Sequence, residues 1–169
     1  PAEIIPAVVI MLFAGVRPDY LNGELSRLTW SDIRLARRII RLDGAITKTG
    51  NSRTVEISNN LAAWLEPHAQ ATGKIIESPG RFRKLWECAR QDAGLYEGWP
   101  HDGTRNSFVT YHVARHGDEY KTCAQSGHDV TTLRRHYKDL ADTEDAKAYF
   151  GITPATIADT TSIARAQAS

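Results

Sequence analysis

The stretch from His101 to Tyr137 constrains the fold most, because two glycines divide it into three short helical segments. The first segment ends at Gly117, and the second covers residues 119–126 and ends at Gly127. Glycine commonly follows a helix, since it adopts the left-handed backbone that closes the last turn. An aspartate precedes each of the last two segments, where its carboxylate can cap free N–H groups. The sequence therefore predicts three successive helices, the third over residues 130–138.

Three side chains in this stretch suit cleavage of a phosphodiester without a metal ion, namely Arg105, His128 and Tyr137. A guanidinium binds two phosphate oxygens at once, an imidazole transfers protons near neutral pH, and a phenol can act as the nucleophile. Tyr137 also follows Leu133 by one helical turn, which is equally the pattern of a core tyrosine with its hydroxyl at the rim. The residues alone leave both interpretations open.

The rest of the chain predicts a mainly α fold with a small three-stranded antiparallel β-sheet. Residues 3–14 are apolar nearly all round, which favours a helix buried on most sides, and Gly15 ends it. Aliphatic residues alternate with arginines between residues 32 and 57 around an Asp-Gly turn, the pattern of a three-stranded sheet. Further helices are expected over residues 20–28, 58–65 and 78–93, with a last short one over 142–150.

Charge and composition are those of an ordinary globular protein. The net charge is +1, no apolar run is long enough to span a bilayer, and the opening residues lack the basic lead of a secretory signal. Cys88 and Cys123 have no metal-ligand spacing, so we expect reduced core thiols of a cytoplasmic protein and no structural zinc. Basic residues gather between positions 27 and 53, which indicates either a phosphate-facing patch or a solvated face. They are Arg27, Arg34, Arg37, Arg38, Arg41, Lys48 and Arg53.

The motifs in this chain resemble the catalytic domain of tyrosine recombinases, the phage-integrase family. The resemblance runs from about Ile4 to Tyr149. Its motifs are Arg-Asn-Ser-Phe from Arg105, Gly127-His128, Tyr137, the turn Gly15–Pro18, and the hairpin Thr47–Gly50 ahead of Arg53. It implies the tyrosine recombinase catalytic-domain fold, with residues 1–150 as the catalytic domain and 151–169 as a C-terminal tail. The amino-terminal DNA-binding domain of the family is then absent from this chain.

The same resemblance implies DNA strand exchange by transesterification, with no cofactor and no metal. Tyr137 would form a 3′-phosphotyrosine, and Arg17 and Arg105 would clamp the phosphate. His128, with His101 as a possible helper, would assist proton transfer or hydrogen-bond a phosphate oxygen, and Lys48 would protonate the leaving 5′-hydroxyl. The expected partner is double-stranded DNA, bound by a homo-oligomer, a tetramer in the full-length protein, with no membrane and no small-molecule substrate. Further residues assigned to the site or to DNA contact are His101, Arg53, Arg134 and Arg135.

Two departures from the family pattern lie beside these residues. Family members usually carry a glutamate three residues after the first arginine, whereas here Glu24 follows Arg17 by seven, an insertion of about one helical turn. The family histidine three residues before the second arginine is replaced by Asp102, with His101 one residue earlier. A carboxylate repels phosphate, so we expect Asp102 to cap the helix and His101 to support the site.

Three alternatives remain open at this stage. A type IB topoisomerase would share the chemistry, and a DNA-binding domain that has lost catalysis would fit Asp102 and the Asn106 that stands where relatives often have histidine. The third alternative is a helical regulatory or interaction domain in which the motifs are coincidental. It predicts that the named side chains lie far apart in the fold. The segment after Tyr137 packs either on a neighbouring subunit or on its own domain. The residues that would make this contact are Ala146, Tyr149, Phe150 and Ile152.

Overall fold

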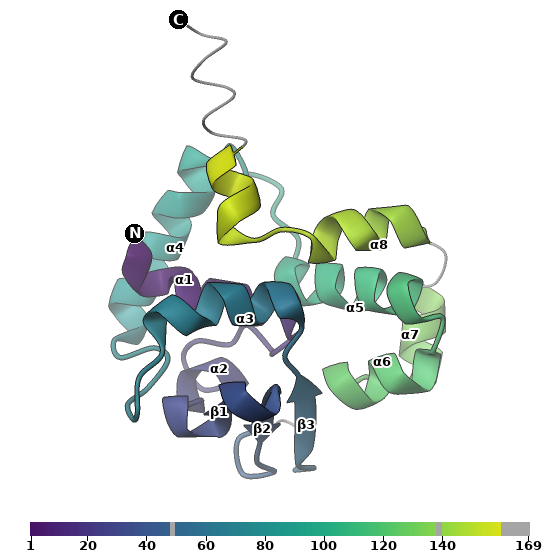
Figure 1. Cartoon of the computed structure of the whole chain (residues 1–169), viewed down its shortest axis with the longest axis horizontal. Helices are drawn as coiled ribbons and strands as arrows, with labels where there is room; N and C mark the ends of the chain where they lie inside the picture. Colours follow the sequence, from purple (N-terminus) through teal and green to yellow (C-terminus); the bar gives the residue numbers. More distant parts are fainter. Residues whose placement is uncertain (48–49, 138–139, 160–169) are drawn as a thin grey trace, which may run out of the picture.

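The fold combines eight named helices with a small sheet in the part of the chain that the structure describes. A computed structural model describes residues 1–47, 50–137 and 140–159 (Figure 1). The sheet lies at one end of the molecule, and α5 to α8 form a separate group beside it (Figure 1). None of the helices in these ranges is long and apolar enough to cross a membrane. The predicted class, mainly α with a three-stranded antiparallel sheet, is confirmed.

Helix α1 (Ile5–Phe13) is the centre of the larger core. A short 3₁₀ turn (Ala2–Ile4) leads into it, and Pro6 sits in its first turn, where a missing N–H costs nothing. Six of its residues are buried, so it is covered on most sides, as its uninterrupted apolar sequence predicts. Helices α3 (Asn59–Leu65) and α5 (Gly103–His116) pack against it. The first turns of α5 therefore lie near the end of the chain segment that leads from α1 to Arg17.

The sheet has the strand order β1-β2-β3, all antiparallel. Its strands are β1 (Ile33–Arg34), β2 (Ile39–Leu42) and β3 (Arg53–Glu56). A 3₁₀ turn at Trp30–Asp32 precedes β1, and a second at Leu35–Arg37 joins β1 to β2. Ile40 pairs with Val55 and both are fully buried, whereas their strand neighbours Arg41 and Thr54 face outward. This alternation is the period of two expected for a sheet with one covered face. All three strands lie within residues 32–57, where the sequence predicts the sheet.

The second predicted helix is shorter than its sequence pattern suggests. It was expected over residues 20–28, but α2 covers only Glu24–Arg27, and Leu21 is 59% exposed. The cause is Asp19, whose carboxylate accepts the backbone N–H groups of Leu21 and Asn22 at 3.0 Å and so forms a turn in place of a helix. Gly23, in extended backbone, then starts α2.

The remaining helices lie where the sequence predicts them. Pro67 falls in a 3₁₀ turn (Glu66–His68) that ends α3. Helix α4 (Pro79–Asp92) packs its apolar stripe on the core and leaves Cys88 exposed. Helices α6 (Glu119–Ser126), α7 (Val130–His136) and α8 (Thr143–Phe150) are each capped at the start by an aspartate side chain. Both cysteines are free thiols, but the expectation of two core positions is wrong for Cys88.

The segment that follows Tyr137 packs on its own domain. Helix α8 lies along α5, where Ala146 is fully buried and the Tyr149 ring stacks on Tyr111 at 4.3 Å (Figure 1). The Tyr149 hydroxyl donates to the carbonyl of Leu12 at 2.5 Å, and the carbonyl of Ile152 accepts the Trp64 indole N–H at 3.1 Å. Of the two arrangements that the sequence left open, the structure has the one within a single chain.

Candidate active site

Arg105 is the most buried charged side chain of the candidate site. It lies in the first turns of α5 and is only 1% exposed. Its Nη2 donates to the carbonyl of Ser126 at 2.6 Å, whereas its Nε and Nη1 are buried without a hydrogen-bond partner. Burial, reinforced by the positive charge of Arg17, lowers the Arg105 pKa to about 10, which still leaves it charged at neutral pH. A buried cation with unused donors is poised to bind an anion.

Arg17 is placed beside Arg105 by the turn that follows α1. Gly15 has a φ of +59°, and a Cβ there would lie 2.3 Å from the ring of Phe108 on α5, so only glycine fits. Arg17 donates its backbone N–H to Glu24 at 3.1 Å, and its side-chain Nε is buried without a partner. The same site therefore holds two guanidiniums with unused donors, and their mutual repulsion is visible in the lowered pKa of Arg105.

Glu24 is the carboxylate that balances part of this charge. It is 2% exposed, and its two oxygens accept two N–H groups of Arg53 at 2.8 and 2.6 Å. Its Oε2 also lies 3.9 Å from Nη1 of Arg105. Burial raises the Glu24 pKa, but the hydrogen bonds and charge of Arg53 outweigh it, so the net pKa is lowered and the group is ionised. Three arginines thus surround one carboxylate, which leaves an excess of positive charge.

His128 projects from the glycine-terminated end of α6, as the sequence predicts. Gly127 has a φ of +71°, and the His128 Nδ1 lies 3.0 Å from the Ser126 hydroxyl. That hydroxyl already donates to the carbonyl of Thr122 at 2.8 Å, so Nδ1 carries the hydrogen and Nε2 keeps its lone pair. Burial, followed by the charges of Arg105 and Arg17, lowers the His128 pKa to about 4. The imidazole is therefore neutral at pH 7, with the lone pair of Nε2 unprotonated.

Tyr137, the last site residue of the stretch, lies at the end of α7 with its ring 5.5 Å from the His128 ring. Its hydroxyl donates to the side-chain oxygen of Asn106 at 2.9 Å, and Asn106 in turn donates to the carbonyl of His101 at 3.1 Å. Burial raises the Tyr137 pKa, against the opposing charge of Arg105. The phenol is thus half-buried and protonated, with its hydroxyl held by Asn106.

His101 and Asp102 lie at the rim of the site. A hollow of about 680 Å³ is lined by both residues together with Arg17, Glu24 and Thr47. The His101 side chain is 96% exposed, with its Nδ1 3.7 Å from the carboxylate of Asp102. Asp102 occupies the cap position of α5 with a φ of +55°, but its side chain makes no capping hydrogen bond. The expectation of a side-chain cap is therefore wrong, and only the Asp102 carbonyl receives an N–H, that of Asn106 at 2.8 Å.

The structure brings Arg17, Arg105, His128 and Tyr137 together and separates Arg53 from the other two expected DNA contacts, Arg134 and Arg135. Arg53 lies inside the site, held by Glu24, while Arg134 is exposed and pairs with Glu119 at 2.7 Å. Arg135 is exposed on α7. Lys48 lies outside the described residues, although Thr47 beside it borders the hollow.

Sequence reasoning missed Asn106 as the partner of Tyr137 and Arg53 as the partner of Glu24. Both contacts join residues far apart in the chain, across separations of 31 and 29 positions, and no local pattern signals them. In the sequence, Glu24 stands out only as part of a displaced family motif. A buried glutamate near several arginines is a signal for a salt bridge, but the sequence does not say which arginine forms it.

Comparison with known proteins gives the class of this fold. No family model matches the sequence, and no curated protein matches it. Solved structures do match, and they show that the chain has the fold of tyrosine recombinase catalytic domains, as its motifs imply.

Two of these solved structures illustrate the likeness. XerA recombinase has a TM-score of 0.63 and 20% sequence identity over 88% of this chain. The Tn1549 transposon integrase, in complex with a circular intermediate DNA, has a TM-score of 0.55 and 18% identity over 85% of this chain. The chain spans 57% of the XerA chain and 56% of the integrase chain.

Proposed function

We propose that this chain carries the reaction centre of a site-specific DNA recombinase, or integrase, that cuts and rejoins DNA through a 3′-phosphotyrosine. The observation that carries the proposal is the buried Arg105 guanidinium, whose Nε and Nη1 lack partners beside the equally unpartnered Nε of Arg17. Leaving such donors unsatisfied is costly, and a phosphodiester supplies the oxygens that they lack. The tyrosine hydroxyl and a neutral imidazole lie in the same cluster.

The roles follow from the position and protonation of each group. Tyr137 attacks phosphorus, so a tyrosine O–P bond forms while the P–O5′ bond breaks and the 5′-oxygen leaves. Arg17 and Arg105 stabilise the charge that develops on the non-bridging oxygens. His128 keeps its Nε2 lone pair and so accepts the phenol proton directly or through water. Lys48 protonates the leaving oxygen, and His101 supports the rim. Rejoining reverses these steps, with a 5′-hydroxyl as the nucleophile.

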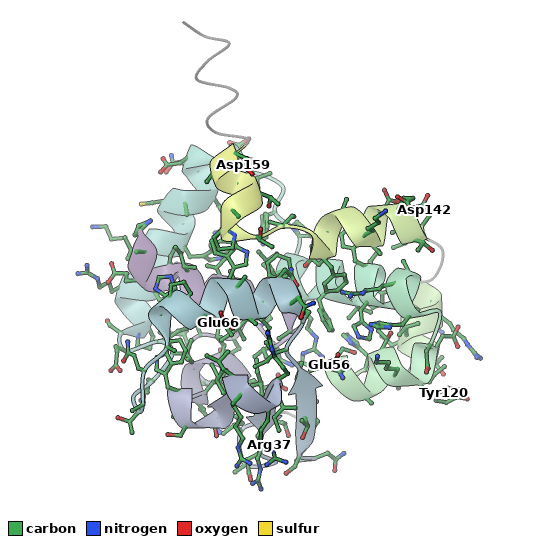
Figure 2. All side chains as sticks on the ribbon, viewed as in Figure 1. Arg37, Glu56, Glu66, Tyr120, Asp142 and Asp159 are labelled. Atoms are coloured by element: carbon green, nitrogen blue, oxygen red, sulfur yellow. The ribbon has the colours of Figure 1, made fainter. Side chains whose placement is uncertain are left out.

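The partner in this proposal is double-stranded DNA. Five arginines of the predicted basic patch are exposed around the sheet, and Figure 2 shows Arg37 projecting from that end of the molecule. They are Arg27, Arg34, Arg37, Arg38 and Arg41. Exposed arginines contribute a sequence-independent affinity that weakens with salt. In this proposal residues 1–150 form the catalytic domain, Arg134 and Arg135 add phosphate contacts, and the full-length protein acts on DNA as a tetramer.

Trapping the covalent intermediate tests the proposal. Random-sequence duplexes in which sulfur replaces the bridging 5′-oxygen are incubated with the protein at low salt and resolved under denaturing conditions. A thiolate leaves without being protonated, so this substrate tests Tyr137 and the arginines independently of Lys48. We expect a covalent adduct with the wild type and with Tyr120→Phe, a surface tyrosine on α6, and none with Tyr137→Phe.

A second candidate function is a DNA-binding domain without catalysis. The observation in its favour is that the Tyr137 proton is donated to the Asn106 amide oxygen, which is not a base. It predicts that the duplex binds with the salt dependence of phosphate contacts while no adduct forms, even with the sulfur substrate. A type IB topoisomerase would form the adduct but relax supercoils without exchanging strands between two sites.

A further inference from the structure

Arg53 was expected to contact DNA, but three hydrogen bonds hold its guanidinium inside the protein. Nη1 and Nη2 donate to the two oxygens of Glu24 at 2.8 and 2.6 Å, and Nε donates to the carbonyl of Gln125 at 3.1 Å. Its side chain is only 11% exposed. A DNA phosphate would have to displace the Glu24 carboxylate to reach the same fork of donors. The Arg53 guanidinium is therefore committed to Glu24 and Gln125, and it is not free to bind DNA.

Two arginines anchor the carboxyl end of α6 at successive carbonyls. Arg53 binds that of Gln125, and Arg105 binds that of Ser126. The Gln125 side chain adds a further tie by accepting the backbone N–H of Glu56 on β3 at 2.7 Å. Gly127 follows directly, and a Cβ on it would lie 3.3 Å from Nη1 of Arg53. Cations are favourable at this end of a helix, so Arg53 helps to fix the turn that carries His128.

Glu24 is the second group that Arg53 controls. Its Oε2 lies 3.9 Å from Nη1 of Arg105, one of the two unpartnered nitrogens of that guanidinium. Without Arg53 to hold both oxygens, a small rotation would bring the carboxylate onto Arg105. The Glu24 carboxylate would then neutralise the charge of the Arg105 guanidinium, which in the proposed function binds a phosphate.

We propose that Arg53 is a positioning residue, which keeps the Glu24 carboxylate off Arg105 and fixes the turn of His128, and that it does not bind DNA phosphate. The proposal rests on the proposed function only in naming a phosphate as the ligand of Arg105. The arrangement itself concerns the DNA-free protein, so it is open to a test that needs no DNA.

The test is an NMR titration of the His128 imidazole in the whole chain without DNA. Four charged groups act on this ring: Arg105 and Arg17 lower its pKa, while Asp129 and Asp102 raise it. Its other close neighbours are the Ser126 hydroxyl and the Tyr137 ring. If Glu24 turns onto the two arginines, their effect on His128 weakens and its pKa rises.

Four variants separate this effect from a loss of charge or of folding. Arg53→Met is expected to raise the His128 pKa by about one unit, as a nearby charge does. Arg53→Met combined with Glu24→Gln removes the carboxylate that moves, so the pKa returns toward the wild-type value. Arg53→Lys loses the two-point contact and is expected to give an intermediate rise. Arg81→Met breaks the same kind of two-point pair, with Glu3 on the surface, and is expected to leave His128 unchanged.

The double variant also tests DNA contact, because it keeps the net charge of the protein constant. For a fluorescein-labelled duplex, the slope of log affinity against log salt is expected to equal that of the wild type. A phosphate contact by Arg53 would lower that slope by about 0.9. An unchanged His128 titration in Arg53→Met and Arg53→Lys overturns the proposal, as does the lowered slope. Failure of the wild type to bind any duplex or form an adduct would instead overturn the proposed function, and leave the DNA-free titration to decide the role of Arg53.

Discussion

Replacing Arg105 with methionine should stabilise the DNA-free protein while abolishing the proposed formation of a covalent adduct with DNA. Burial lowers the Arg105 pKa from the usual value of an arginine to about 10, so the folded structure disfavours the charged guanidinium. At about 1.4 kcal/mol per pKa unit, the penalty is about 3 kcal/mol. It is present throughout the neutral range, because both folded and unfolded chains remain protonated until the pH approaches the lowered pKa. Methionine has a comparable length and no charge to bury.

Two terms oppose this gain. The hydrogen bond from Arg105 to the carbonyl of Ser126 is lost, and a charged hydrogen bond contributes about 2 kcal/mol. Methionine also fills the space less completely than a guanidinium. We therefore expect Arg105→Met to increase the free energy of unfolding by about 1 kcal/mol, as happens when buried charges without a full set of partners are replaced by apolar side chains.

Urea titration followed by tryptophan fluorescence measures this change, since the chain has four tryptophans. Arg53→Met is the matched control, with the same substitution and the opposite expected sign. It leaves the buried Glu24 without its main partner, which costs about 3–5 kcal/mol for a broken buried pair. If Arg105→Met proved less stable than wild type by more than about 1 kcal/mol, Arg105 would be a structural residue and the unused-donor argument would fail.

Three further predictions follow from individual contacts. Gly15→Ala should lower the free energy of unfolding by about 3 kcal/mol in urea titration, because alanine disfavours the left-handed backbone and its Cβ would clash with Phe108. A decrease of less than about 1 kcal/mol would contradict the close packing of Gly15 on Phe108. His128 should titrate by NMR near pH 4, and because the unfolded chain takes up its proton first, stability should fall as the pH drops from about 6.5 to 4; a pKa near 6.5 would mean an exposed ring. Tyr149→Phe loses the bond to Leu12 and should lower the unfolding free energy by about 1 kcal/mol, with no change expected if α8 docks elsewhere.

Much of the fold could be predicted because its signals are local. Gly117 and Gly127 end α5 and α6 in left-handed backbone, and the next helices begin at the capping residues Asp118 and Asp129. The alternation of apolar and polar residues along β2 and β3 predicts the sheet and shows which of its faces is covered. The helix over residues 20–28 failed because the Asp19 side chain competes for backbone N–H groups, an interaction that a hydrophobic pattern does not register.

The site was predictable as a set of residues but not as a network. Arg17, Arg105, His128 and Tyr137 were predicted from motifs that resemble those of tyrosine recombinases, and the structure places them in one cluster. The partner of each was not predictable, because partners are chosen by tertiary packing. Arg53 had the sequence context of a surface arginine and is instead the main partner of a buried glutamate. An arginine after a hairpin can be either a surface residue that contacts DNA or a buried partner of a carboxylate. The packing of α6 against β3 decides between the two for Arg53.

The proposed function requires that Tyr137 itself becomes linked to DNA, and peptide mapping of the trapped adduct measures this directly. After nuclease and trypsin digestion, we expect the nucleotide remnant on the short peptide from His136 to Lys138, with the phosphate on the phenolic oxygen. A remnant on any other residue, or an adduct that persists in Tyr137→Phe, would show that Tyr137 is not the nucleophile.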